Sequence, residues 1–137
     1  VYKITKKSET YETVMQFYAS EFNSFDCADN GKYIVSLAKY GSANDFEVSV
    51  YSSNGKKKAS ISIDCAIKSV TMSDKYIFAL AENTIIVYNL NGREISRIDV
   101  KGDARSILST DKYVYIYSLD KLTRCYSYGD SVIELSN

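Results

Sequence analysis

The feature that most constrains this chain is an internal repeat. Three separate signatures recur at one shift of 37 residues. The pairs are Tyr51–Gly55 with Tyr88–Gly92, Ser73–Ile77 with Thr110–Val114, and Lys68–Val70 with Arg105–Ile107. Agreement of three signatures on one period indicates a repeat architecture, in which each unit is one supersecondary element packed against its neighbours.

A more diverged copy precedes these units. Asn23–Phe25 and Asp29–Ile34 carry the same signatures, with a longer loop near residues 41–45. Short runs that alternate apolar and polar residues, such as Glu47–Tyr51 and Tyr113–Tyr117, predict antiparallel strands. A unit of this length that holds four short strands has the size of a propeller blade.

Turn residues separate the strands. Asn54-Gly55 and Asn91-Gly92 predict two-residue type I′ hairpins, because both central residues of that turn need positive φ. A helix is conceivable only near Thr10–Phe22, where β-branched and aromatic residues favour a strand instead. We therefore predict an all-β fold.

The repeat divides the chain into β-propeller-type blades of four antiparallel strands. Residues 1–21 supply an outer half-blade of two strands, and residues 22–66, 67–104 and 105–137 supply one blade each. The prediction is a single partial propeller domain of about three and a half blades. Because such a partial ring leaves two blade faces bare, we expect self-association, most simply as a homodimer.

Charge and composition narrow the function classes. The 17 Lys and Arg residues balance the 17 Asp and Glu residues, so nothing predicts a nucleic-acid partner. The absence of His removes Ser/His and Cys/His nucleophile pairs and His-containing zinc sites. No apolar run has the length of a membrane helix, and Val1 is not an initiator residue. A membrane connection is thus expected only through a segment absent from this sequence.

Three cysteines, Cys27, Cys65 and Cys125, are widely spaced and form no C-x-x-C motif. We predict reduced thiols that pack as small hydrophobic side chains.

The blade signatures carry a family resemblance. The pattern aliphatic-x-Val-Tyr-x-x-Asn-Gly-Lys/Arg occurs at Val48–Lys56 and Ile85–Arg93, and x-Ser-aliphatic-x-x-Ser/Thr-Asp-Lys-Tyr-aliphatic occurs at Lys68–Ile77 and Arg105–Val114. It resembles bacterial β-propellers of the PQQ-like and WD40-like superfamilies, especially an uncharacterised family of membrane-anchored envelope propellers. The resemblance implies an extracytoplasmic location in the cell envelope. No residues match PQQ or metal ligands, so we expect no cofactor and no metal.

Two pairs open the innermost strands of their blades: Lys68-Ser69 and Arg105-Ser106. They could form a cationic, hydroxyl-lined pocket for a small anion or an acidic peptide. Alternatively, the serines are small because inner strands crowd together, while the Lys and Arg stems extend to solvent.

The loops that differ in length between blades are further candidates for contact residues, since loops on a rigid scaffold commonly carry recognition. These candidates are Asn44, Asp45, Lys101 and Asp103.

Two repeated side-chain types have competing interpretations. Asp29, Asp74 and Asp111 could form a metal ring or an acid/base pair, but a hairpin Asp that accepts hydrogen bonds from its own turn amides explains them more simply. The alternating row Tyr113, Tyr115 and Tyr117 could stack on a ligand or fill the space between two blades. Blade packing is the favoured interpretation.

The sequence as a whole predicts a non-catalytic binding or scaffold propeller, the extracytoplasmic part of a larger bacterial protein, with a protein, peptide or small anionic partner. The alternative is a hydrolase or lyase that uses Asp, Lys and Tyr residues in the central funnel. A pocket that collects several ionisable groups with shifted pKa values would favour the enzyme. No catalytic residue is assigned.

Overall fold

The computed structural model describes residues 2–5, 8–13, 21–40, 45–101, 103–126 and 132–135. These residues form strands and turns without a helix, and the strands pair antiparallel throughout. The all-β, propeller-type fold class with four-stranded blades is therefore confirmed. Within the described ranges, no helix has the length and apolarity needed to cross a membrane.

The strands fall into four sheets, each in sequence order from its first strand. The first is a two-stranded hairpin of β1 (Tyr2–Thr5) and β2 (Ser8–Thr13). Blade 1 comprises β3 (Glu21–Cys27), β4 (Tyr33–Lys39), β5 (Phe46–Ser52) and β6 (Lys57–Ile63). Blade 2 comprises β7 (Ser69–Met72), β8 (Tyr76–Leu80), β9 (Thr84–Asn89) and β10 (Glu94–Asp99). Blade 3 comprises β11 (Ala104–Ser109), β12 (Tyr113–Ser118), β13 (Leu122–Tyr126) and β14 (Val132–Leu135).

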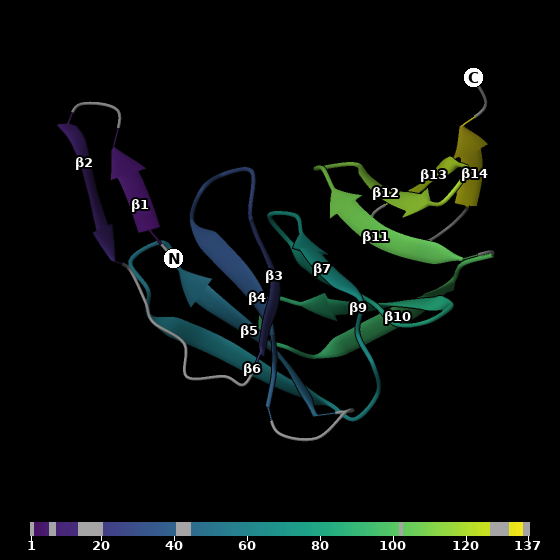
Figure 1. Ribbon diagram of the computed structural model, residues 1–137, viewed down its shortest axis with the longest axis horizontal. Coiled ribbons are helices and arrows are strands. Elements are labelled where there is room, and N and C mark those ends of the chain that lie inside the picture. Colours follow the sequence, from purple (N-terminus) through teal and green to yellow (C-terminus); the bar gives the residue numbers. More distant parts are fainter. Residues whose placement is uncertain are drawn as a thin grey trace.

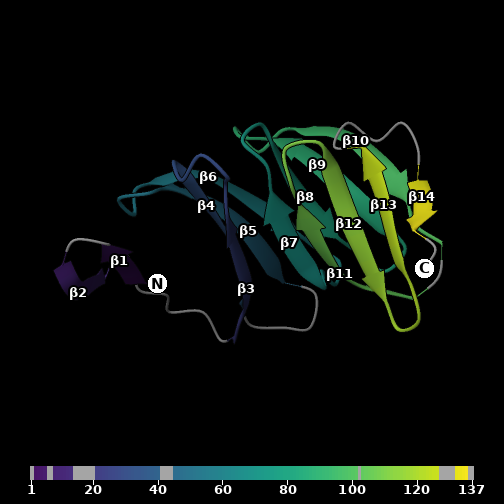
Figure 2. The same ribbon diagram turned by 90° about the horizontal axis from the view of Figure 1, so that it is seen from above.

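The blades stand next to one another in chain order, and β7 lies between β3 and β11 (Figures 1 and 2). These three innermost strands therefore line the concave side of the arc. The β1–β2 hairpin lies at the end of the molecule opposite blade 3 in both views.

Two apolar clusters hold the arc together, one at each blade junction. Between blades 1 and 2, Val35, Leu37 and Val48 pack with Val70 and Met72. The junction of blades 2 and 3 contains Phe78, Leu80, Ile85, Ile107 and Ile116. Because side chains alternate along a strand, blade 2 buries one row of side chains against blade 1 and the other row against blade 3.

The Asn-Gly hairpins differ from the prediction. Gly55 and Gly92 have φ of 89° and 86°, but no described non-glycine residue has positive φ, so a type I′ turn is wrong at both sites. The amide of Gly92 donates to Asn89 O, and the amide of Asn89 donates to Arg93 O. This is a three-residue loop in which a type I turn is followed by a left-handed glycine.

The cysteines only partly follow the prediction. All three are free, and Cys125 is buried between blades 2 and 3. Cys27 and Cys65 are exposed, so the expectation that they pack as hydrophobic side chains is wrong.

Candidate functional site

The predicted inner-strand residues lie at one end of the blades. Strands β7 and β11 begin where β8 and β12 end, since Ser69 pairs with Leu80 and Ala104 pairs with Ser118. We call the group Lys68, Asp103 and Arg105, which sits at this end beside the innermost strands, the mouth cluster. The structure thus brings together residues that lie more than 30 positions apart in the chain.

The mouth cluster is centred on one carboxylate. Lys68 Nζ lies 3.8 Å from Asp103 Oδ1 and Arg105 Nη2 lies 3.7 Å from Asp103 Oδ2. Lys68 Nζ also donates a 2.9 Å hydrogen bond to the carbonyl of Ala104, which holds this ammonium at the first residue of β11. Arg105 is 53% exposed and makes a longer, single contact, so most of its guanidinium donors face solvent. An exposed guanidinium can hold a carboxylate through two parallel hydrogen bonds.

The serines of the innermost strands do more than provide small side chains, because they form hydrogen bonds between blades. Ser69 Oγ lies 3.4 Å from Ser106 Oγ and 3.4 Å from the amide of Ile107, from which it accepts a hydrogen bond. Ser24 Oγ accepts in the same way from the amide of Val70, also at 3.4 Å. Each serine therefore links its innermost strand to the innermost strand of the next blade.

The loop candidates are placed around the same end. Lys101 and Asp103 are exposed between β10 and β11, and Asp45 is exposed before β5, where its carbonyl accepts from the amide of Tyr40. Asn44 lies outside the described residues. Asp64, Glu82 and Asp120 are exposed in loops at this end as well. The rim is thus mixed in charge, since exposed lysine and arginine side chains lie at the same end as these carboxylates, namely Lys68, Lys101, Arg105 and Lys121.

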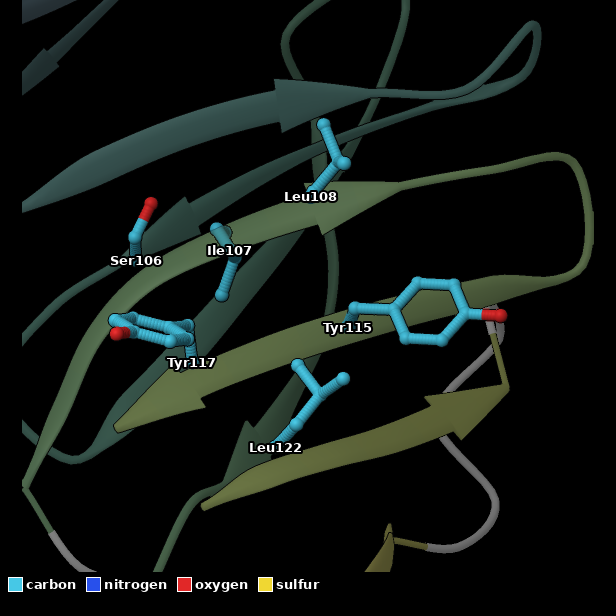
Figure 3. Close-up of a pocket in the computed structure, with 6 residues that line it drawn as sticks. All are labelled: Ser106, Ile107, Leu108, Tyr115, Tyr117 and Leu122. Carbon is cyan, nitrogen blue, oxygen red and sulfur yellow. The ribbon is translucent and has the colours of Figure 1, made fainter. Parts of the chain in front are cut away.

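A second feature that the sequence did not predict is a pocket on the face of blade 3 turned away from blade 2 (Figure 3). It encloses about 300 Å³ and is lined by Ser106, Ile107, Leu108, Tyr115, Tyr117 and Leu122. Tyr117 is 56% exposed, so this member of the tyrosine row does not fill space between two blades of the described chain, while Tyr113 and Tyr115 are half-buried. The signal for the pocket was present in the repeat, because the 37-residue shift relates Tyr117 to the buried Leu80.

The prediction that the repeated aspartates accept hydrogen bonds from their own turn amides is wrong in its detail. The amides of Lys75 and Tyr76 donate to Ser73 Oγ, and the amide of Tyr113 donates to Thr110 Oγ1. The hydroxyl residue before Asp74 and before Asp111 therefore closes the turn, whereas Ala28 precedes Asp29 and the amide of Lys32 donates to Asn30 Oδ1 there. Asp74 instead accepts a 3.0 Å hydrogen bond from the amide of Asn30 in blade 1.

Three ionisable groups with shifted pKa values, Tyr40, Glu47 and Lys57, lie together in blade 1, away from the mouth cluster. Partial burial acts to raise the pKa of Glu47, but hydrogen bonds from Lys57 at 2.8 Å and Ser49 at 2.6 Å outweigh it, and the pKa is lowered. The hydrogen bond to Glu47 raises the pKa of Lys57. Burial, followed by the charge of Glu47, raises the pKa of Tyr40. This network has the form of a satisfied ion pair. No group of three or more Cys, Asp or Glu side chains in the described part of the chain is placed to hold a metal ion.

Comparison with known proteins agrees with the fold. The model of a family of unknown function (DUF5711) matches residues 1–124. No curated protein sequence matches the chain. Among solved structures, HIRA residues 644–1017 align with a TM-score of 0.61 at 12% identity, covering 77% of this chain and 35% of that one. Hsv2 of Kluyveromyces lactis aligns with a TM-score of 0.62 at 9% identity, covering 85% and 36%.

A bacterial structure shares the fold too. BamB from Moraxella catarrhalis aligns with a TM-score of 0.55 at 16% identity, covering 81% of this chain and 30% of that one. These neighbours are propeller proteins, and this chain spans about a third of their length.

Proposed function

Because the chain belongs to the family of unknown function DUF5711, we propose a function from its own surfaces: a non-catalytic binding and scaffold propeller that recognises an acidic segment of a protein or peptide. The observation that carries this proposal is the exposure of Arg105. Its side chain is half exposed beside the innermost strands, and its guanidinium lies 3.7 Å from the carboxylate of Asp103. Lys68 adds a second positive charge at the same place.

Recognition would use the carboxylates of the partner. An incoming carboxylate can replace the 3.7 Å contact of Arg105 with Asp103 by a shorter bidentate pair, while Lys68 stays anchored on Ala104 O. Lys101, Asp103 and Asp45 belong to the surrounding rim, and with Asn44 they are the proposed contact residues. Ser69 and Ser106 shape the inner edge of the site. A small anionic ligand would use the same two cations.

The test is titration calorimetry with a decameric glutamate peptide, with free glutamate and with a decameric lysine peptide. Arg105→Gln and Lys68→Gln should each weaken binding of the glutamate peptide by about tenfold, the effect of removing one charged contact. Lys112→Gln is the matched control, because Lys112 is exposed in the β11–β12 turn at the other end of the blade. Equal affinity for the glutamate and lysine peptides would contradict the proposal, and binding of free glutamate alone would assign a small anion.

The same proposal treats residues 1–137 as one partial propeller domain of a larger bacterial protein, located outside the cytoplasm. The resemblance of its blade signatures to membrane-anchored envelope propellers supports this location. The exposed thiols of Cys27 and Cys65 provide the test, since a membrane-impermeant maleimide labels them in intact cells only if the domain is extracytoplasmic. Labelling that requires lysis would place the domain in the cytoplasm.

The proposal also includes self-association through the exposed blade faces, as a homodimer. Support comes from the exposed apolar side chains of blade 3, namely Leu108, Tyr117 and Leu122, which are 58%, 56% and 40% exposed. Exposed apolar patches of this kind commonly mark interaction surfaces.

A further inference from the structure

The pocket of blade 3 is an open copy of a surface that is covered in blade 2. Its lining residues Leu108, Tyr117 and Leu122 come from β11, β12 and β13 (Figure 3) and are 58%, 56% and 40% exposed. The 37-residue shift relates the six lining residues to six residues of blade 2 that are at most 7% exposed. These are Ser69, Val70, Thr71, Phe78, Leu80 and Ile85. The segment that covers blade 2 therefore shows what the pocket of blade 3 can hold.

Blade 2 is covered by an extended strand, β11. Its Ile107 packs in one apolar cluster with Phe78, Leu80 and Ile85. The amide of Ile107 donates a 3.4 Å hydrogen bond to Ser69 Oγ. We call a residue that packs on the apolar surface of the preceding blade and donates its own amide to the serine of that blade an anchor residue.

The junction of blades 1 and 2 repeats this arrangement. Its anchor residue is Val70, which packs with Leu37 and Val48 and donates its amide to Ser24 Oγ at 3.4 Å. Ser106 is the equivalent serine of blade 3, and it lines the pocket. The pocket thus has the groups needed to receive an aliphatic anchor residue of an extended segment.

A cation precedes this serine in blades 2 and 3. Lys68 Nζ of blade 2 lies 3.8 Å from the carboxylate of Asp103, which stands four residues before the anchor Ile107. Arg105 has the position of Lys68 in blade 3, and its side chain is 53% exposed. A segment that covers blade 3 as β11 covers blade 2 brings a carboxylate at the same spacing to Arg105. A guanidinium can bind that carboxylate through two parallel hydrogen bonds.

Two positions of blade 3 favour a single covering segment over a whole blade. Leu108 stands where Thr71 accepts a hydrogen bond from β11, so one link between innermost strands is not available. Arg124 stands where Val87 is buried, and its guanidinium lies 4.2 Å from the centre of the Tyr113 ring. A whole blade would bury this charge in the place of an apolar side chain, which is costly. A single strand over the pocket leaves Arg124 at its margin.

We infer that this pocket binds one extended segment of a partner protein, in which Asp or Glu stands four residues before Val, Ile or Leu. The aliphatic side chain fills the space between Leu108, Tyr117 and Leu122. Its amide donates to Ser106 Oγ, and the carboxylate pairs with Arg105. The inference rests on the proposed recognition of an acidic segment by Arg105, and it deepens that proposal by naming an apolar anchor and its spacing from the carboxylate.

The experiment is fluorescence polarisation of a labelled octapeptide that copies residues 103–110, Asp-Ala-Arg-Ser-Ile-Leu-Ser-Thr. Replacing its Ile by Ser should weaken binding at least about tenfold, because the anchor side chain is lost. Replacing its Asp by Asn should weaken binding about fivefold, because one charged contact is lost. Exchanging its first two residues keeps the composition but shortens the spacing, and it should weaken binding as much as the Asn replacement.

Protein variants locate the bound peptide. Leu108→Asp and Leu122→Asp should each weaken binding of the octapeptide at least about tenfold, because each places a charge in the apolar contact. Arg105→Gln should weaken the Asp peptide about fivefold and leave the affinity of the Asn peptide unchanged. Ile95→Asp is the matched control, because Ile95 is 52% exposed on the outermost strand of blade 2. Circular dichroism confirms that each variant is folded, and the more exposed Leu108 decides the test if Leu122→Asp unfolds.

Three outcomes overturn the inference. The first is an octapeptide that fails to bind at millimolar concentration, or that binds equally well with Ile or Ser. Binding of the glutamate peptide that depends on Arg105 would then leave the proposed function intact, whereas failure of both peptides contradicts both. The second is binding that neither Leu108→Asp nor Leu122→Asp weakens. The third, measured by light scattering, is a dimer that Leu122→Asp dissociates and the octapeptide does not, which would show that a second copy occupies the pocket.

Discussion

The hydroxyl of Thr71 on β7 donates a 2.6 Å hydrogen bond to Oδ2 of Asp26 on β3. Thr71 Oγ1 in turn accepts a 2.8 Å hydrogen bond from the amide of Ser109 on β11. One fully buried hydroxyl thus connects the innermost strands of all three blades. The equivalent positions on β3, β7 and β11 hold Asp26, Thr71 and Leu108. Leu108 has no side-chain oxygen that could accept a hydrogen bond, and this face of blade 3 is open.

Thr71→Val removes this link at nearly constant volume. It leaves the amide of Ser109 without its acceptor and removes one donor from Asp26, so the free energy of unfolding should fall by about 1–3 kcal/mol. Urea unfolding measures the change. Thr71→Ser keeps the hydroxyl and should lose less, and equal losses for the two variants would show that the methyl group, not the hydrogen bonds, carries the stability.

Leu80 and Tyr117 occupy equivalent positions in blades 2 and 3. Leu80→Ala removes a side chain that is fully buried at the junction and should destabilise the fold by about 2–5 kcal/mol. Tyr117→Ala removes a side chain that is more than half exposed and should cost less than about 1 kcal/mol in the monomer. Thermal unfolding at low concentration checks the contrast, and comparable losses would mean that the face of blade 3 turned away from blade 2 is covered.

The repeat made the fold predictable, because a conserved spacing of turn and strand signatures defines which strands are equivalent. It also placed Lys68, Asp103 and Arg105 in neighbouring units. The sequence did not determine the Asn-Gly turn type, since left-handed glycine suits both a two-residue and a three-residue loop. Asn89 Oδ1 accepts from the amides of Asn91 and Arg93 and stabilises the longer loop.

Contacts between blades were the part that sequence patterns could not supply. Asp74 looks like an ordinary turn residue, yet its partner is the amide of Asn30 in another blade. The serine at the start of each inner strand was visible as a repeated residue, but its acceptor role needs the distance to the next strand. The pocket followed from the same repeat only once the equivalent positions of blades 1 and 2 were known to be buried.

Gly92 and Gly31 allow a comparison of how much an alanine at a left-handed glycine position lowers the free energy of unfolding. Both have positive φ, 86° and 70°, so an Ala at either position costs about 1–2 kcal/mol. At Gly31 a Cβ atom would meet nothing within 4 Å, whereas at Gly92 it would lie 3.1 Å from Cγ1 of Ile61 in blade 1. Gly92→Ala should therefore be the more destabilising change in chemical unfolding, and a larger loss for Gly31→Ala would contradict this account of the blade 1–blade 2 contact.

The ion pair of Glu47 with Lys57 should make the free energy of unfolding fall as the pH becomes acidic. Because the folded-state pKa of Glu47 is lowered, its contribution is present above the unfolded-state pKa of about 4.3 and is lost as pH falls through the folded value. Glu47→Gln should be less stable than wild type by about 0.5–1 kcal/mol at neutral pH. The difference should vanish in acid, and a difference that persists at about pH 2 would show that packing rather than charge is responsible.

Cys125 should behave differently from the other two thiols. Burial raises its pKa to about 11, so at pH 8 it is almost entirely protonated as well as shielded from reagents. Cys27 and Cys65 are exposed, and a disulfide-exchange reagent should titrate these two thiols in the native protein. The third should react only on unfolding, at a rate that follows global opening of the blade 2–blade 3 junction. Cys125→Ala should leave the native thiol count unchanged, whereas rapid native reaction of all three cysteines would show that this junction opens locally.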